Sequence, residues 1–196
     1  MSVSKSLLFG ALVIAALPPS VNAKTQKAVG FGPVFYSGVA ASALVPTYAF
    51  DFSFSANNRI ARSFYFTNRF NFGFLTGDDF AGRGAYYGIA GSYTFGPRLN
   101  LGKDRVIPYI EAGPVIGMFA AQLSSPAATD SKNQTAVKYG YGLGIGFDSL
   151  SGEEKGWGME VSYFHFLTSP SLFEFPAKSL TATGIKLEFR FLLKEK

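Results

Sequence analysis

Histidine, hydroxyl and carboxylate side chains, the residue types that serine-type acyl transfer combines, occur close together late in the chain. His165 is the only histidine, and Ser169, Ser171 and Glu174 follow it within nine residues. In such chemistry a base activates a hydroxyl nucleophile while an acid orients the base. The sequence has no cysteine, which excludes a thiol nucleophile, a disulfide scaffold and a Cys-ligated zinc site.

The elements that must position these residues are β-strands, because apolar and small or polar residues alternate through most of the chain. In residues 137–148 the odd positions carry large apolar side chains, whereas most even positions are glycine. In residues 181–193 the odd positions again become apolar, and the even positions include charged residues. Alternation with a period of two places one set on each face of a strand.

This pattern predicts eight strands joined by connections of two kinds. Asn57-Asn58-Arg59, residues 97–105 and residues 151–154 are interpreted as polar turns, whereas residues 121–136 and 169–180 form the longest connections. An even strand count with short turns at one end and longer loops at the other is typical of transmembrane barrels. The expected strands are residues 27–37, 45–55, 60–74, 85–96, 106–119, 137–148, 156–168 and 181–193.

We therefore predict an all-β fold, an eight-stranded antiparallel up-and-down transmembrane β-barrel with short periplasmic turns and longer external loops. A soluble barrel of this size would turn its apolar side chains inward around a ligand. Here the glycines lie on the polar face and the bulky Phe and Tyr side chains on the other. Because eight strands leave little interior room, the bulky face is expected to point outward, into lipid.

The N-terminal residues 1–23 predict a cleaved secretory signal peptide, with the barrel domain in residues 24–196. Lys5 precedes the apolar run at residues 7–17, and Val21 and Ala23 suit a signal peptidase. The run is shorter than the roughly 17 residues that a membrane helix needs. The charges of the remaining chain are scattered, so nucleic acid is not an expected partner.

The signal peptide, the strand count and the final strand Gly184-Ile185-Lys186-Leu187-Glu188-Phe189-Arg190-Phe191 carry a family resemblance. The chain resembles the eight-stranded outer-membrane barrels of Gram-negative bacteria, of the OmpA and OmpX type. The resemblance implies a monomer in the cell outer membrane, with lipid, lipopolysaccharide and the barrel-assembly machinery as partners. Family members usually end at the aromatic residue, so residues 192–196 are interpreted as a short periplasmic tail.

The inward face of the predicted barrel receives seven charged residues. Isolated buried charges cost several kcal/mol each, so these groups are expected to pair and to plug the lumen. An ion path through a narrow pore is the alternative. A last hairpin centred near residue 175 would place Glu160 opposite Arg190. The predicted interior network consists of Asp51, Arg69, Glu111, Glu160, Lys186, Glu188 and Arg190.

A second resemblance concerns His165, near the external end of its strand, and the phrase Pro108-Tyr109-Ile110-Glu111-Ala112-Gly113. Both are similar to features of the lipid A deacylases of the PagL type. That resemblance implies His165 as general base for a serine that attacks a lipid A ester. The resemblance implies a serine two residues after the histidine, but position 167 of this sequence is leucine. Ser169 or Ser171 is therefore the candidate nucleophile, with Glu174 as the acid that orients the histidine. The alternative is an interfacial histidine among aromatic neighbours.

No cofactor or metal is expected. The glycines at positions 140, 142, 144 and 146 repeat every second residue with no helix after them, which is typical of a strand face and not of a phosphate loop. The function that the sequence favours is a barrel without a channel, with a structural or surface-interaction role. A lipid A ester hydrolase and a narrow pore remain as alternatives.

Overall fold

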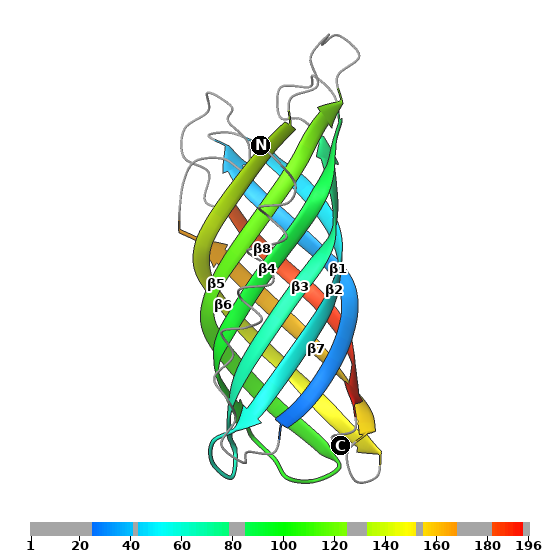
Figure 1. The fold of residues 1–196 in the computed structure, drawn as a ribbon, viewed down its shortest axis with the longest axis vertical. Coiled ribbons are helices and arrows are strands. Elements are labelled where there is room, and N and C mark those ends of the chain that lie inside the picture. The colour runs from blue at the N-terminus through cyan, green and yellow to red at the C-terminus, as the bar shows by residue number, and fades with distance from the viewer. Residues whose placement is uncertain are drawn as a thin grey trace.

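The computed structural model describes residues 25–40, 43–78, 85–124, 133–151, 155–167 and 182–193. Eight antiparallel strands in sequence order form a closed barrel, in which β1 pairs with β8 (Figure 1). No helix in this described part of the chain could cross a membrane. The strands are β1 (Thr25–Ala40), β2 (Ala43–Arg59), β3 (Phe64–Asp78), β4 (Ala85–Asn100), β5 (Val106–Ser124), β6 (Asn133–Ser151), β7 (Lys155–Phe166) and β8 (Ala182–Leu193).

The predicted fold is confirmed, and the alternation in the sequence is its cause. Along β7 the exposed residues are almost all odd-numbered and the buried residues even-numbered. Trp157, Met159 and Val161 point outward, whereas Glu160 and Ser162 are buried. A shift of the pairing by one residue would exchange these two sets, so the pattern also fixes the register.

The two ends of the barrel differ. At the end that we call the turn end, residues 60–63 connect β2 to β3 and residues 101–105 connect β4 to β5. The start of β1 and the end of β8 lie there too, since Lys27 faces Leu193. At the opposite end, the loop end, the connections fall at residues 41–42, 79–84, 125–132 and 168–181, outside the described residues.

At the turn end the predicted ends of β2 and β4 are wrong, as are the predicted start of β3 at residue 60 and the assignment of Leu192 and Leu193 to a tail. Asn57, Asn58 and Arg59 belong to β2, and β4 continues to Asn100. The side chain of Asn57 is buried and accepts a hydrogen bond from Thr67 of β3 at 2.9 Å, which holds this polar segment in the sheet. Likewise β8 runs through Leu193, with Leu192 buried, so these two leucines are part of the barrel and not of a tail.

The interior contains two layers stacked along the barrel axis. Towards the loop end lies an apolar cluster, here called the aromatic layer, which comprises Tyr36, Phe119, Phe164 and Phe166 with Val34, Ala49, Leu75, Ala90 and Val115. Towards the turn end lies the polar layer, which comprises Tyr109 and the inward-facing charged residues Asp51, Arg69, Arg98, Glu111, Asp148, Glu160, Lys186, Glu188 and Arg190.

The aromatic layer contradicts the expectation that bulky apolar residues all point outward. The physical reason lies in the glycines that face these rings. A Cβ atom at Gly117 would lie 2.8 Å from ring atoms of Phe119 and Phe166, and one at Gly184 would lie 2.8 Å from the Tyr36 ring. The space that these glycines leave empty is thus filled by aromatic side chains, which come from the same strand, from the adjacent strand or from across the lumen, and this keeps the interior close-packed.

Candidate functional site

All seven charged residues of the predicted interior network lie on the inward side of the barrel, and six of them are at most 3% exposed. The seventh, Glu111, is only half-buried as a whole residue, but its side chain is no more than 8% exposed. The residues come from β2, β3, β5, β7 and β8, so their contacts cross the lumen. The structure brings six of the seven together through ion pairs, which leaves Asp51 without an ion pair in this set.

Glu160 is the centre of the polar layer. Both of its carboxylate oxygens accept hydrogen bonds from Arg69, one of them at 2.6 Å from Nη2. Arg190 Nη1 lies 3.1 Å from Glu160 Oε2, and the Tyr109 hydroxyl donates to the same oxygen at 2.7 Å. Ser162 also donates to Oε1. Charge-assisted bonds of this kind are roughly twice as strong as neutral ones.

Glu188 is the second point at which charges converge. Lys186 Nζ lies 2.6 Å from Glu188 Oε2, and Ser53 donates to Glu188 Oε1 at 2.8 Å. Lys186 also donates to Asn71 Oδ1 at 2.6 Å, while Arg190 Nε lies 3.7 Å from Glu188 Oε1. This group is therefore connected to Glu160 through Arg190.

A third ion pair, between Arg98 and Asp148, was not among the predicted contacts. Arg98 Nη2 lies 2.5 Å from Asp148 Oδ2, and its guanidinium carbon lies 3.5 Å from the centre of the Tyr109 ring. Arg98 was not predicted to face the lumen, because residues 97–105 were interpreted as a turn. Asp148 could have been found, since it shares the inward parity of the glycines at positions 140–146.

The predicted ion pair between Glu160 and Arg190 is present, but the two residues are not directly opposite each other in the ladder, as the prediction had placed them. In the β7–β8 ladder Glu160 faces Glu188, and Arg190 faces Gly158. Two carboxylates directly opposite each other would repel. Arg190 relieves this repulsion because it lies near both of them, and its long side chain reaches Glu160 diagonally across the ladder.

Asp51 stands apart from the ion pairs. It is 3% exposed, and its Oδ1 atom has no hydrogen-bond partner among the residues that the structure describes. In the described polar layer the acidic residues are Asp51, Glu111, Asp148, Glu160 and Glu188, against the basic residues Arg69, Arg98, Lys186 and Arg190. Asp51 is thus the carboxylate for which this layer has no cation in contact.

His165 lies on the outer face near the loop end, where its ring centre is 5.1 Å from that of Tyr141. Its strand neighbours are Tyr141 on β6 and Thr183 on β8, and no described residue forms a hydrogen bond with its Nδ1 atom. The other proposed catalytic residues, Ser169, Ser171 and Glu174, lie outside the described residues. Within the described residues, no three His, Asp or Glu side chains gather in a way that could hold a metal ion.

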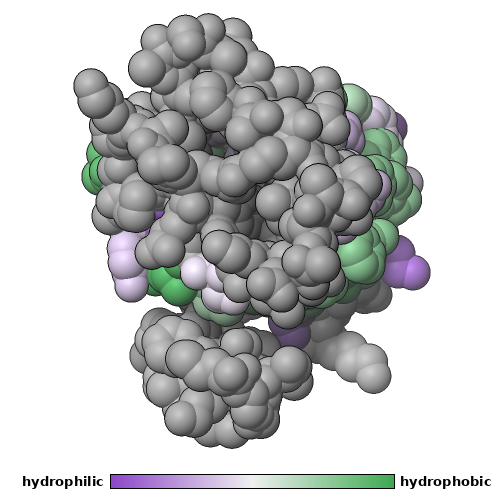
Figure 2. All heavy atoms as spheres, turned by 90° about the horizontal axis from the view of Figure 1, so that it is seen from above, coloured by the Kyte–Doolittle hydropathy of each residue, from purple (hydrophilic) through white to green (hydrophobic). Residues whose placement is uncertain are grey.

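The outer surface of the barrel is apolar on every strand. Exposed Phe, Tyr, Leu, Ile and Val side chains alternate with buried residues on all eight strands. Figure 2 looks onto the loop end and shows hydrophobic side chains at the periphery of the described part. Near the turn end Trp157 stacks on Phe189, with ring centres 5.9 Å apart. Soluble monomers rarely expose a continuous apolar belt of this extent.

An apolar exterior, a closed ladder and a charged interior together define the class of eight-stranded outer-membrane β-barrels. Solved structures support this assignment at the level of the fold. OprG of Pseudomonas aeruginosa aligns with a TM-score of 0.56 and 11% identity, over 90% of this chain and 99% of that chain. A major outer membrane protein of Thermus thermophilus aligns with a TM-score of 0.55 and 13% identity, over 87% and 100% of the two chains.

The attachment invasion locus protein Ail of Yersinia pestis, solved with the heparin analogue sucrose octasulfate, is similar as well. Its TM-score is 0.53 at 10% identity, over 87% of this chain and 99% of that chain. No protein-family model matches the sequence, and a comparison with curated proteins finds no match. At such low identity these likenesses establish the OmpA/OmpX-type fold and leave the activity open.

Proposed function

We propose that this chain is a barrel of the bacterial outer membrane that conducts no ions and has a structural or surface-interaction role. The observation that carries this proposal is the filled lumen. The polar layer and the aromatic layer lie one above the other, and both are made of side chains with almost no exposed surface. An eight-stranded barrel is just wide enough for such side chains to fill it.

The apolar exterior supports membrane insertion. Because lipid offers no hydrogen bonds, a spanning sheet must close, and the β1–β8 ladder closes this one. The expected partners are outer-membrane lipid, lipopolysaccharide and, during biogenesis, the barrel-assembly machinery. We expect the folded chain to act as a monomer, since the closed ladder of the eight described strands leaves no free strand edge for a second copy to extend.

The test of a closed lumen is a conductance measurement on the folded protein in planar bilayers. We expect no steady single-channel conductance from the native protein. Folding is checked beforehand by the different gel mobility of heated and unheated samples. Steady conductance that changes with Glu160→Gln or Arg190→Gln would show that ions pass through the polar layer, and the narrow pore would replace the closed barrel.

A lipid A ester hydrolase is the second candidate, and the position of His165 favours it. This histidine lies on the lipid-facing side near the loop end with its ring beside Tyr141, and within the described part of the chain its buried Nδ1 atom has no hydrogen-bond partner. In that mechanism His165 would take the proton of Ser169 or Ser171 as the hydroxyl attacks an ester carbonyl. Glu174 would orient the imidazole.

Mass spectrometry of lipid A separates the two candidates. The comparison uses outer membranes from cells that express the native protein and, separately, His165→Ala. For a barrel without catalytic activity we expect identical lipid A in both samples. Loss of one acyl chain only with the native protein would establish the hydrolase. Tyr163→Ala, which removes a neighbouring outward aromatic side chain, is the control for local disturbance of the surface.

A further inference from the structure

The turn end of the barrel is rich in exposed positive charge. Every Lys and Arg side chain that is exposed in the described part of the chain lies there, together with the exposed carboxylate of Asp104. The sequence next to these strands, residues 152–154 and 194–196, adds three glutamates and two lysines, so positive charge stays in excess. Where a barrel leaves the membrane, such an excess attracts anionic lipid. The exposed bases are Lys27, Arg59, Arg62, Lys103, Arg105 and Lys155.

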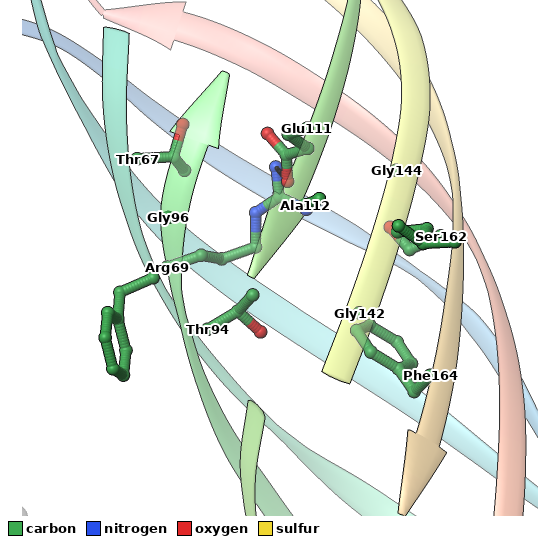
Figure 3. A pocket seen from close by; sticks show the side chains of 12 residues that line it. Thr67, Arg69, Thr94, Gly96, Glu111, Ala112, Gly142, Gly144, Ser162 and Phe164 are labelled. Atoms are coloured by element: carbon green, nitrogen blue, oxygen red, sulfur yellow. Dashed lines mark ion pairs between the residues drawn. The ribbon is translucent and has the colours of Figure 1, made fainter. Parts of the chain in front are cut away.

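The basic residues of the polar layer are already paired and are not available to an external anion. Figure 3 shows Arg69 reaching towards Glu111 in the lumen, where its Nη2 atom lies 3.0 Å from Glu111 Oε1. The cavity beside this pair has a volume of about 10 Å³, which is the space for one water molecule. A phosphate group is larger than that. An anionic ligand is therefore expected to bind to the exposed bases at the turn end.

Two of these bases flank one position of β8 on the outer wall. Lys27 of β1 is directly opposite Leu193 of β8. On the other side of β8, Gly156 is opposite Leu192, so Lys155 and Leu193 are the next facing positions of β7 and β8. Since neighbouring strands lie about 4.8 Å apart, the backbones of the two lysines are about 10 Å apart. Their long flexible side chains can therefore converge on one headgroup in front of Leu193.

The next outward row towards the middle of the barrel is apolar. Phe191 of β8 is opposite Val29 on one side and Trp157 on the other. These three side chains, here called the apolar row, are all exposed. Two cations thus lie directly beside an exposed apolar surface. This order of charged and apolar groups matches a lipid with an anionic headgroup, whereas a water-soluble anion would make no use of the apolar row.

We propose that Lys27 and Lys155, on either side of Leu193, bind the headgroup of an anionic phospholipid. The two ammonium groups donate hydrogen bonds to its phosphate, and an acyl chain lies along the apolar row. The inference rests on the membrane insertion that is part of the proposed function. It is independent of whether the lumen conducts ions and of whether His165 is catalytic.

Trp157 is the only tryptophan of the chain and belongs to the apolar row, so its fluorescence reports on the lipid at this place. The native protein is reconstituted in equimolar phosphatidylglycerol and phosphatidylcholine, with bromine on the acyl chains of either one lipid or the other. Bromine quenches an indole only at short range. We expect a preference for phosphatidylglycerol of about two- to tenfold, the range that one or two exposed ion pairs correspond to. High salt should reduce this preference.

A pair of double variants tests the two lysines. Lys27→Gln with Lys155→Gln should abolish the preference for phosphatidylglycerol. The matched control, Arg62→Gln with Lys103→Gln, removes the same charge from the β2–β3 and β4–β5 connections and should leave the preference unchanged. Folding of both is checked by gel mobility, and the salt dependence of the native protein is a test that needs no variant.

Three outcomes would overturn the lipid site. Equal quenching of the native protein by both brominated lipids would show that the lysines do not select an anionic headgroup. An equal loss of preference in both double variants would assign the effect to the overall charge of the turn end. Quenching by neither lipid would contradict membrane insertion itself, and with it the proposed function on which the site rests.

Discussion

Replacing Glu160 by alanine is expected to destabilise the barrel more than any other single truncation in the polar layer. Arg69 and Arg190 would both lose the carboxylate that they share, and the Tyr109 hydroxyl would lose its acceptor. Removing one partner of a buried ion pair costs about 3–5 kcal/mol, because the remaining charge stays buried and uncompensated. The quantity to measure is the free energy of unfolding in urea, followed by the loss of the heat-sensitive gel mobility.

Two variants make the result for Glu160 interpretable. Val161→Ala truncates the adjacent outward residue, which is 45% exposed, and should change the free energy of unfolding far less. Glu160→Gln keeps the shape and one acceptor oxygen, so its effect should lie between those of the two truncations. If Glu160→Ala is no more destabilising than Val161→Ala, the polar layer does not stabilise the fold.

Replacing Phe119 by alanine is expected to have the second large effect. Its ring packs edge-on against Tyr36 and Phe166, with ring centres 5.6 Å apart in both pairs. Phe119 is 1% exposed, so the truncation leaves a cavity inside the barrel. Large-to-small changes of this kind cost about 3–5 kcal/mol in packed cores. The same urea unfolding measurement checks the loss.

The prediction for Phe119 includes a functional part. Since the polar layer lies below the aromatic layer, folded Phe119→Ala should still show no steady conductance in planar bilayers. Met118→Ala, at the adjacent outward-facing position of β5, is the matched control for stability. A folded Phe119→Ala barrel that conducts ions would show that the aromatic layer alone closes the lumen.

The fold was predictable because the residues that face the two sides of a strand alternate along its sequence. In β6 glycine alternates with Tyr139, Tyr141, Leu143 and Ile145, and this places the large side chains in lipid and the small ones inside. The closed barrel follows, since eight such strands in a membrane must satisfy every backbone group. The boundaries failed where polar residues such as Asn57 stay in the sheet through buried side-chain hydrogen bonds.

The members of the polar layer were predictable from parity wherever the strand ends were correct. Arg69, Glu160 and Lys186 lie on the small face of their strands and are buried in the structure. Arg98 was not predicted as a member, because the expected strand ended at residue 96 and Arg98 was therefore assigned to a turn. Contacts across the lumen, such as that between Arg98 and Asp148, depend on barrel closure and have no local sequence signal.

By itself, the sequence determined the strand number, the lipid-facing side and the charge-bearing side, because these depend on alternation within single strands. Only the tertiary structure decided that Phe119, Phe164 and Phe166 fill the loop end of the lumen. It also decided that Glu160 faces Glu188 and is paired by Arg190 from another position. The physical reason is that contacts between strands depend on how the strands are staggered relative to one another in the closed barrel. A glycine likewise leaves room for an aromatic ring of another strand only when barrel closure brings the two together.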